Sequence, residues 1–275
     1  MTNPRIAVII PSFNRGSLLG ETLQSVTSQT FQHWECVIVI GGDDNAVDVA
    51  REWSAKDPRI KFIEQKTSGP SEARNIGIRA TTAPYIFPLD DDDLIDPTFF
   101  DRALRILESD TQIKVVTSKV MQFGHVEREL PLAPYSYANL LMRNCIICCC
   151  LYRREDFERV GGYDVSFFVL EDWDFWISVL DGTSKVHRID EYLYFYRRHA
   201  SGSLVNSFVD SKKNYQDHID RIYKKHIDKY FAIQGNPILL YRDYVILRAF
   251  QKKVSNTAVF RMLAWLRKKT KKASK

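Results

Sequence analysis

Residues 85–97 read Tyr-Ile-Phe-Pro-Leu-Asp-Asp-Asp-Asp-Leu-Ile-Asp-Pro, an apolar run that ends in four consecutive aspartates. The apolar part, residues 85–89, is typical of a buried strand. Four like charges at the end of such a strand repel one another, and a bound cation would relieve that repulsion. Carboxylate oxygens are hard ligands that suit Mg²⁺ or Mn²⁺. An acidic surface turn is the other interpretation, because most short charge runs are solvated, but the strand in front favours a cation site.

Strand-like and helix-like patterns alternate on the N-terminal side of this stretch. We expect strands at 5–11, 34–40, 61–64 and 85–89, with helices near 18–26, 47–54 and 71–81 between them. This alternation predicts an α/β fold with a doubly wound, mostly parallel sheet flanked by helices. Ligands of such sheets bind at the carboxyl ends of the strands. The loops 12–15, 41–45 and 90–93 follow three of these strands, so we expect them to converge on one crevice.

Composition narrows the class of protein. With 275 residues, 45% of them hydrophobic and 27% charged, the chain resembles an ordinary globular protein with a sizeable core. It has no apolar stretch long enough to span a bilayer and no signal-peptide pattern at residues 1–5, so we expect a cytoplasmic protein. Of its five cysteines, Cys148, Cys149 and Cys150 are contiguous, which favours buried reduced thiols over a zinc site.

The C-terminal part differs in character. We expect a catalytic domain over residues 1–205 and a helical extension over 206–275, rich in Lys, Tyr and Ile. Residues 261–275 hold seven basic residues and no acidic one. An apolar helical face within 259–266 precedes this basic end, which suits an anionic membrane surface; a helix packed on the body with a solvated basic end is the alternative. Nucleic acid is not an expected partner, because the rest of the chain is slightly acidic.

Five motifs occur in a fixed order along residues 5–203. They are Val-Ile-Ile-Pro-Ser-Phe-Asn-Arg at 8–15, a Gly-Pro-Ser…Ala-Arg-Asn…Gly segment at 69–77, Leu-Asp-Asp-Asp-Asp at 89–93, Glu-Asp-Trp-Asp at 171–174 and Tyr-Arg-Arg-His at 196–199. Together they resemble the inverting glycosyltransferases of family 2, which have the GT-A fold. The resemblance implies a nucleotide-sugar donor, with a UDP-sugar favoured, and a divalent metal, Mn²⁺ or Mg²⁺, that stabilises the departing diphosphate.

The resemblance also assigns candidate residues to the donor and the metal. Asp92 is the expected metal ligand, and Asp90 is expected near the ribose hydroxyls or behind the metal. His199 is a second metal candidate, although a lone histidine is more often structural. Arg74 could hold phosphate or the nucleobase through its fork of donors, or form an ion pair on a helix surface. The expected donor-binding residues are Pro11, Ser12, Phe13, Arg15, Asp43, Arg74, Asp90 and Asp91.

The pair Glu171 and Asp172 is the candidate catalytic centre for the acceptor. An inverting transferase needs a general base for the acceptor hydroxyl, and the resemblance implies Asp172 for this role, with Glu171 as an orienting or acceptor-binding neighbour. The same two residues also suit the N-terminus of a helix over 173–180, where the helix dipole favours acidic side chains. Both interpretations can hold for the same residues.

One segment departs from the family pattern. The second strand usually ends in Asp-Asp-Gly-Ser, whereas this chain has Gly41-Gly42-Asp43-Asp44. Either Asp43 reaches the nucleobase from a shifted loop, or base recognition has changed. We therefore expect a metal-dependent inverting transferase that acts on a surface polysaccharide or a lipid-linked glycan, in the cytoplasm or on the inner face of the plasma membrane. A catalytically silent nucleotide-binding subunit of a glycan assembly complex is the alternative.

Overall fold

The first four strands form the parallel half of the sheet. In the computed structural model, which describes residues 3–42, 44–66, 69–200 and 212–255, β1 (Ile6–Ser12) lies between β2 (Trp34–Ile40) and β4 (Tyr85–Pro88), and β3 (Ile60–Glu64) lies outside β2. All three pairings are parallel. β1 and β2 are almost wholly buried, as their continuous apolar runs predict. The four expected strands are confirmed.

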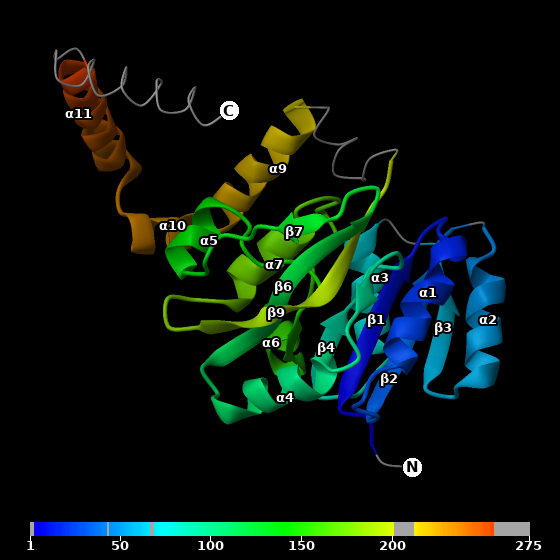
Figure 1. Cartoon of the computed structure of the whole chain (residues 1–275). Helices are drawn as coiled ribbons and strands as arrows, with labels where there is room; N and C mark the ends of the chain where they lie inside the picture. The colour runs from blue at the N-terminus through cyan, green and yellow to red at the C-terminus, as the bar shows by residue number, and fades with distance from the viewer. Residues whose placement is uncertain (1–2, 43, 67–68, 201–211, 256–275) are drawn as a thin grey trace, which may run out of the picture. The chain divides into compact units, whose positions relative to one another are not determined.

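Helices make the crossovers between these strands (Figure 1). They are α1 (Gly16–Thr27), α2 (Ala46–Lys56) and α3 (Pro70–Arg79), close to the predicted ranges. α1 buries Leu19, Leu23 and Val26 at helical spacing. α3 begins with Pro70 directly after Gly69, a favoured start because the first helical N–H has no partner within the helix. This alternation brings the ends of β1, β2 and β4 to one edge of the sheet.

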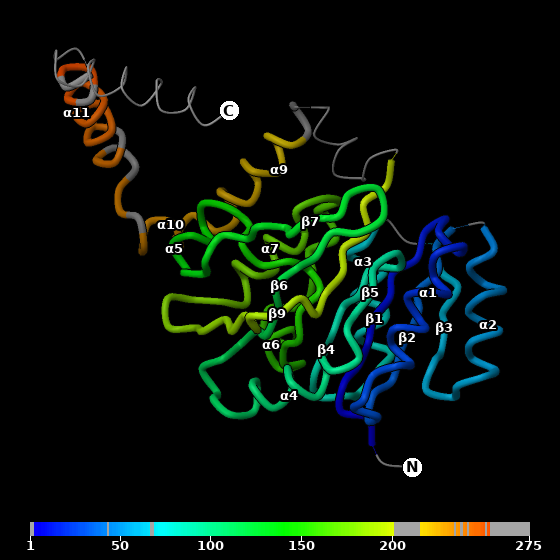
Figure 2. Tube along the Cα trace, in the orientation of Figure 1, coloured from blue at the N-terminus to red at the C-terminus, as the bar shows by residue number. Residues whose placement is uncertain are grey.

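The second half of the sheet is mixed. β4 pairs antiparallel with β8 (Leu151–Arg153), β8 pairs antiparallel with β6 (Ile113–Gly124), and β6 runs parallel to β9 (Lys185–Arg198). Figure 2 shows that β6 and β9 run side by side along their length. The short strands β5 (Leu94–Ile95) and β7 (Arg128–Leu130) pair with β9 and β6. The helices of this half are α4 (Phe99–Ser109), α5 (Tyr137–Met142), α6 (Arg154–Val160) and α7 (Glu171–Val179). The predicted α/β class is confirmed.

Within the residues that the structure describes, three helices follow β9, and the chain divides into two compact units. The first unit spans Met1–His226 and includes α9 (Lys212–Lys225). The second spans Ile227–Lys275 and includes α10 (Ile227–Gln234) and α11 (Pro237–Ser255). The predicted C-terminal helices are present within residues 212–255. The expected amphipathic stretch at 259–266 lies outside the described residues.

The cysteines are buried reduced thiols, as expected. All five are free, four are buried and Cys148 is half-buried. Burial raises the pKa of Cys149 well above its ordinary value, which keeps its thiol protonated. Cys36 and Cys149 belong to the hydrophobic core, and Cys148 packs against it.

Gly77 sets how closely α3 approaches the sheet. A Cβ atom at this position would lie 2.6 Å from Cγ2 of Ile9 in β1 and 3.2 Å from Cγ2 of Val39 in β2. Both neighbours belong to fully or almost fully buried side chains. The glycine thus lets the helix that carries Arg74 lie directly on the strands.

We predict that Gly77→Ala lowers the free energy of unfolding by about 1–3 kcal/mol, because the added methyl group overpacks the core. Gly20→Ala is the matched control in α1, where the nearest atom to the new Cβ is 3.8 Å away. That control should stabilise the protein by roughly 0.5–1 kcal/mol, as expected for alanine in a helix. Urea unfolding of the two variants measures both effects; equal stabilities would contradict the close approach of α3.

Candidate active site

The four aspartates follow β4 at the carboxyl edge of the sheet. Asp91, Asp92 and Asp93 are buried, with at most 6% of each exposed, and Asp90 is half-buried. The Thr22 hydroxyl of α1 donates to the backbone carbonyls of Asp91 at 3.0 Å and Asp93 at 2.9 Å. A solvated acidic turn would not be enclosed in this way. The acidic run is therefore part of a buried site and is not an exposed surface turn.

Asp92 has partners from two distant parts of the chain. Its Oδ2 accepts from Nη1 of Arg15 at 2.5 Å and lies 2.7 Å from Nε2 of His199. Arg15 immediately precedes α1, and His199 follows β9. Nearby carboxylates, Asp92 foremost, raise the pKa of Arg15 against the opposing effect of its burial. The predicted neighbours Asp92, Arg15 and His199 are thus brought together.

Asp91 faces the end of β1. The backbone N–H of Phe13 lies 3.4 Å from its Oδ2, and Nη1 of Arg15 lies 3.6 Å from its Oδ1. Burial raises the pKa of Asp91 to about 7, while the Ser12 hydroxyl and Arg15 oppose that rise. Pro11 and Ser12 belong to β1, and Ser12 is buried. Phe13 is different, because 64% of its surface is exposed beside the acidic run.

Both carboxylate oxygens of Asp93 accept hydrogen bonds from other residues of the protein. The Tyr194 hydroxyl donates to its Oδ2, and the Arg197 backbone N–H donates to its Oδ1 at 2.7 Å. Burial raises its pKa well above the ordinary value for aspartate. Ligand atoms of Asp90, Asp93 and Cys149 do lie within 4.8 Å of one another. Because both Asp93 oxygens already accept hydrogen bonds from β9, we assign Asp93 to holding β9 against the site.

Arg74 joins the two acidic motifs. Its Nη2 donates to Asp90 at 2.9 Å and its Nη1 donates to Glu171 at 2.7 Å. Burial would lower its pKa, but Cys148, Asp90 and Glu171 raise it well above the ordinary value. Arg74 is only 3% exposed, so the expected alternative of a helix-surface ion pair is wrong. One buried guanidinium fixes the carboxylates after β4 and at the start of α7 relative to each other.

Glu171 and Asp172 open α7, as the dipole interpretation predicts. Leu170, directly before them, has a φ of 61°, an uncommon conformation for a residue with a branched side chain. Oδ2 of Asp172 accepts from Nδ2 of Asn144 at 2.8 Å. Burial, with Glu171 adding to it, raises the pKa of Asp172 to about 7, against the opposing effect of Asn144. A carboxylate with this pKa can accept a proton near neutral pH.

A buried ion cluster holds α7 from its other side. Asp174 accepts from Nζ of Lys225, the last residue of α9, at 2.8 Å and lies 2.8 Å from Nε2 of His226, which follows that helix. Asp174 is 1% exposed and His226 is 6% exposed. Lys225 also donates to Asp164 at 2.8 Å. α9 is therefore fastened to the helix that carries Asp172.

The loop after β2 explains the departure from the family pattern. A Cβ on Gly42 would lie 2.4 Å from Oδ1 and 2.6 Å from the backbone N of Asn14, which itself has a φ of 55°. An aspartate at position 42 is therefore excluded by this backbone. Asp44 accepts from the backbone N–H groups of Gly16 at 2.6 Å and Ala46 at 3.1 Å, at the starts of α1 and α2. Asp43 lies outside the described residues.

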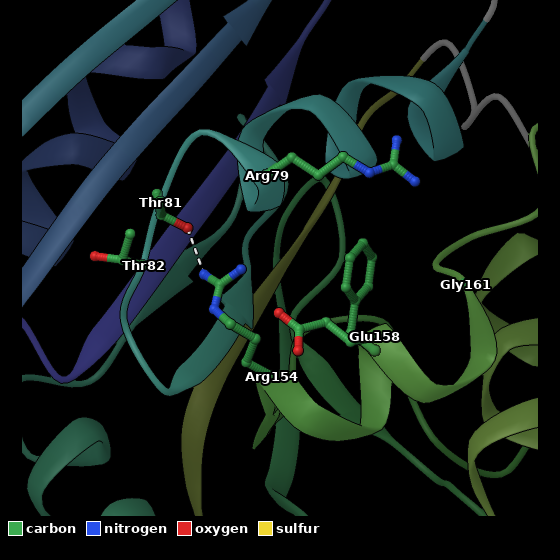
Figure 3. A pocket seen from close by; sticks show the side chains of 7 residues that line it. Arg79, Thr81, Thr82, Arg154, Glu158 and Gly161 are labelled. Atoms are coloured by element: carbon green, nitrogen blue, oxygen red, sulfur yellow. Dashed lines mark hydrogen bonds between the residues drawn. The ribbon is translucent and has the colours of Figure 1, made fainter.

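A hollow of about 570 Å³ lies away from these groups (Figure 3). It is lined by Arg79, Thr81, Thr82, Arg154, Phe157, Glu158 and Gly161. These residues adjoin the start of β4, whereas the aspartates follow its end. Arg154 donates to Thr81 Oγ1 and to the carbonyls of Ile78 and Ala83, at 2.6–2.9 Å. Through those bonds Arg154 holds the segment at the end of α3, which is a structural role. The hollow is therefore not the candidate active site.

Comparison with known proteins identifies the family. Residues 7–161 match the model of glycosyl transferase family 2, which covers more than half of the chain and includes the acidic run. The chain belongs to glycosyltransferase family 2 and is therefore an enzyme that transfers sugar from a nucleotide-sugar donor. The resemblance found from the five motifs is confirmed.

Several relatives extend over most of the chain, and two of them illustrate the similarity. An uncharacterized glycosyltransferase of Haemophilus influenzae is 27% identical over 86% of this chain and 83% of its own length. The uncharacterized glycosyltransferase EpsJ of Bacillus subtilis is also 27% identical, over 82% of this chain and 70% of its own length. Their similarity reaches beyond the residues that the family model matches.

Solved structures share the fold, and two of them contain a bound nucleotide-sugar. TarS of S. aureus, residues 1–349 in complex with UDP-GlcNAc, has a TM-score of 0.65 with 16% identity and covers 83% of this chain and 73% of its own. The mannosyltransferase PcManGT of Pyrobaculum calidifontis, in complex with GDP-Man and Mn²⁺, has a TM-score of 0.61 with 16% identity and covers 96% and 84%. The predicted GT-A fold is confirmed.

We predict that Asp174→Asn lowers the free energy of unfolding by about 2 kcal/mol. This decrease in the free energy of unfolding is smaller than that expected for breaking a fully buried ion pair, because Lys225 remains partly solvated. Asp48→Asn is the control, because it breaks only the exposed pair with Arg51 and should cost less than about 0.5 kcal/mol. Denaturant unfolding compares the two, and equal losses would contradict a structural role for the cluster.

Proposed function

We propose that this protein is a metal-dependent inverting glycosyltransferase that moves a hexosyl group from a nucleotide-diphosphate donor to an acceptor hydroxyl. The observation that carries the proposal is the Asp90–Arg74–Glu171 bridge. It joins the acidic run, where a donor diphosphate would be bound, to the pair that contains the candidate base. The GDP-Man and Mn²⁺ in PcManGT and the UDP-GlcNAc in TarS support a nucleotide-sugar donor.

The residues at the acidic run fit a divalent metal. Asp92 offers a carboxylate oxygen and His199 an imidazole nitrogen at one place, a donor set suited to Mn²⁺. A cation there would stabilise the negative charge that develops on the departing diphosphate. Arg15, already bonded to Asp92, is placed to hold a phosphate oxygen as well. Asp90 and Asp91 would stand behind Asp92, and Ser12 and Phe13 would face the nucleoside.

Asp172 is the proposed base. It removes the proton of the acceptor hydroxyl while that oxygen forms a bond to the anomeric carbon of the sugar. The bond between that carbon and the diphosphate oxygen breaks, with its electron pair remaining on the oxygen, so the anomeric configuration inverts in a single displacement. Arg74 holds Glu171, and Asn144 holds Asp172, which orients both carboxylates.

The nucleobase is proposed to be uracil, with recognition that does not use residue 42. Asn14 fills the space where an acidic side chain would stand, so base contacts would come from Phe13 or Asp43. This packing gives a structural reason for Gly42 that does not require lost activity. It therefore weighs against the alternative of a catalytically silent nucleotide-binding subunit.

The acceptor is proposed to be a growing surface polysaccharide or a lipid-linked glycan, handled in the cytoplasm or at the inner face of the plasma membrane. The basic residues of 261–275 support a position near anionic lipid. None of the helices within the described ranges is both long and apolar enough to cross a membrane.

We predict that Asp172→Asn lowers kcat for transfer by a factor of about 10²–10⁴, the range for loss of a general base, with little change in nucleotide binding. Asp92→Asn should instead weaken Mn²⁺-dependent donor binding and transfer together. Radiolabelled sugar transfer from candidate donors, with and without Mn²⁺, measures both. Full activity of both variants would refute the mechanism, and absence of any turnover by the wild type with all donors would favour the silent subunit.

We predict that kcat rises with pH through about 7, since Asp172 must be deprotonated to act as a base and its pKa is raised to about 7. Asn144→Ala removes a donor that favours the charged form, and a hydrogen bond to a charged group is worth about 1.5–3 kcal/mol. The midpoint of the rise in kcat should therefore move to higher pH by roughly 1–2 units. Asn139→Ala, which alters an exposed amide bonded to Pro134, should leave it in place. An unmoved profile in Asn144→Ala would contradict the assignment of Asp172.

A further inference from the structure

α11 exposes an unusual amount of apolar surface. Its sequence over Pro237–Ser255 contains large apolar side chains that are close to half exposed or more. They are Leu239, Leu240, Tyr244, Ile246, Leu247 and Phe250. A solvated helix would present polar side chains at such positions. The surface is therefore a candidate binding face.

These side chains form one face. Leu239, Ile246 and Phe250 are spaced by seven and four residues, and Leu240, Tyr244 and Leu247 are spaced by four and three, so the two rows run side by side along the helix. Val245 is also exposed but lies on the opposite side. The basic residues of α11 flank this face or lie opposite it: Arg242, Arg248, Lys252 and Lys253. We call the six-residue surface the apolar face of α11.

One acidic residue interrupts this pattern. Asp243 lies between the two rows, and its Oδ1 is 3.3 Å from Nη2 of Arg242. It is exposed, so its charge is solvated in the free protein. At a negatively charged surface this carboxylate would oppose binding, which makes it a sensitive probe of the partner's charge.

Charge identifies the kind of partner. The chain carries a net charge of +5, and its second unit, residues 227–275, carries twelve basic and two acidic residues, or +10. The first unit therefore carries −5. Two copies of the second unit would repel each other, whereas an anionic surface would attract both the flank of α11 and the basic residues that follow it. An apolar face beside such a flank suits the interface of an anionic bilayer.

We propose that α11 lies flat on an anionic lipid bilayer, with its apolar face among the acyl chains and its basic residues at the headgroups. The proposal specifies an interfacial helix that is distinct from the stretch 259–266. It concerns attachment only, and so it stands or fails independently of sugar transfer.

The test is co-sedimentation of the full chain with vesicles of phosphatidylcholine alone or mixed with phosphatidylglycerol. The wild type should bind the anionic vesicles and not the neutral ones. Ile246→Asn/Phe250→Asn should lower that partition by about tenfold or more. Val245→Asn/Ala249→Asn, with the same new side chains on the opposite side of the helix, should retain it. Asp243→Asn should increase it.

Several results would overturn the proposal. Equal binding by Ile246→Asn/Phe250→Asn and the wild type would assign attachment to another segment. Binding to neutral vesicles to the same extent would remove the role of charge. Light scattering that shows a lipid-free dimer, lost in the same variant, would make a second copy the partner. If Ile246→Asn/Phe250→Asn lowered the melting temperature and Val245→Asn/Ala249→Asn did not, the apolar face of α11 would pack against the protein itself.

Discussion

Four consecutive aspartates follow β4, three of them are buried, and burying a carboxyl group is costly unless it has hydrogen-bonding or charged partners. The surrounding protein supplies such partners from several directions. Arg15 precedes α1, Arg74 belongs to α3, the backbone of Arg197 belongs to β9, and His199 follows β9. These groups lie at the carboxyl edge of the sheet because β1, β4 and β9 end there and α1 and α3 begin there. The acidic run thus connects the fold to the proposed chemistry.

Arg74 extends this arrangement to the acceptor side. Because it is buried and bonded to both Asp90 and Glu171, a shift of α7 would break a charged hydrogen bond in the core. α7 is fastened again through Asp174 to α9. The two described non-glycine residues with positive φ, Asn14 and Leu170, adjoin Arg15 and Glu171, so backbone strain is concentrated beside the candidate donor and base residues.

The sequence predicted the parallel half of the fold well, because buried parallel strands leave continuous apolar runs such as residues 5–11 and 34–40. It also predicted that Asp92, Arg15 and His199 meet, through the ordered motifs. It did not predict Asn144, Tyr194 or Lys225 as partners of the site. Their roles depend on packing between segments far apart in the chain, and no local spacing signals that. Gly42 was visible as a departure, but its reason, the approach of Asn14, required the tertiary structure.

The central claim is that the acidic run binds a metal together with a nucleoside diphosphate. Calorimetric titration of Mn²⁺ into the protein, with and without UDP, tests it most directly. We expect Mn²⁺ to bind far more tightly when UDP is present, and expect Asp92→Ala to abolish that gain. Mn²⁺ binding that is the same with and without UDP, or that survives Asp92→Ala combined with His199→Ala, would contradict the account.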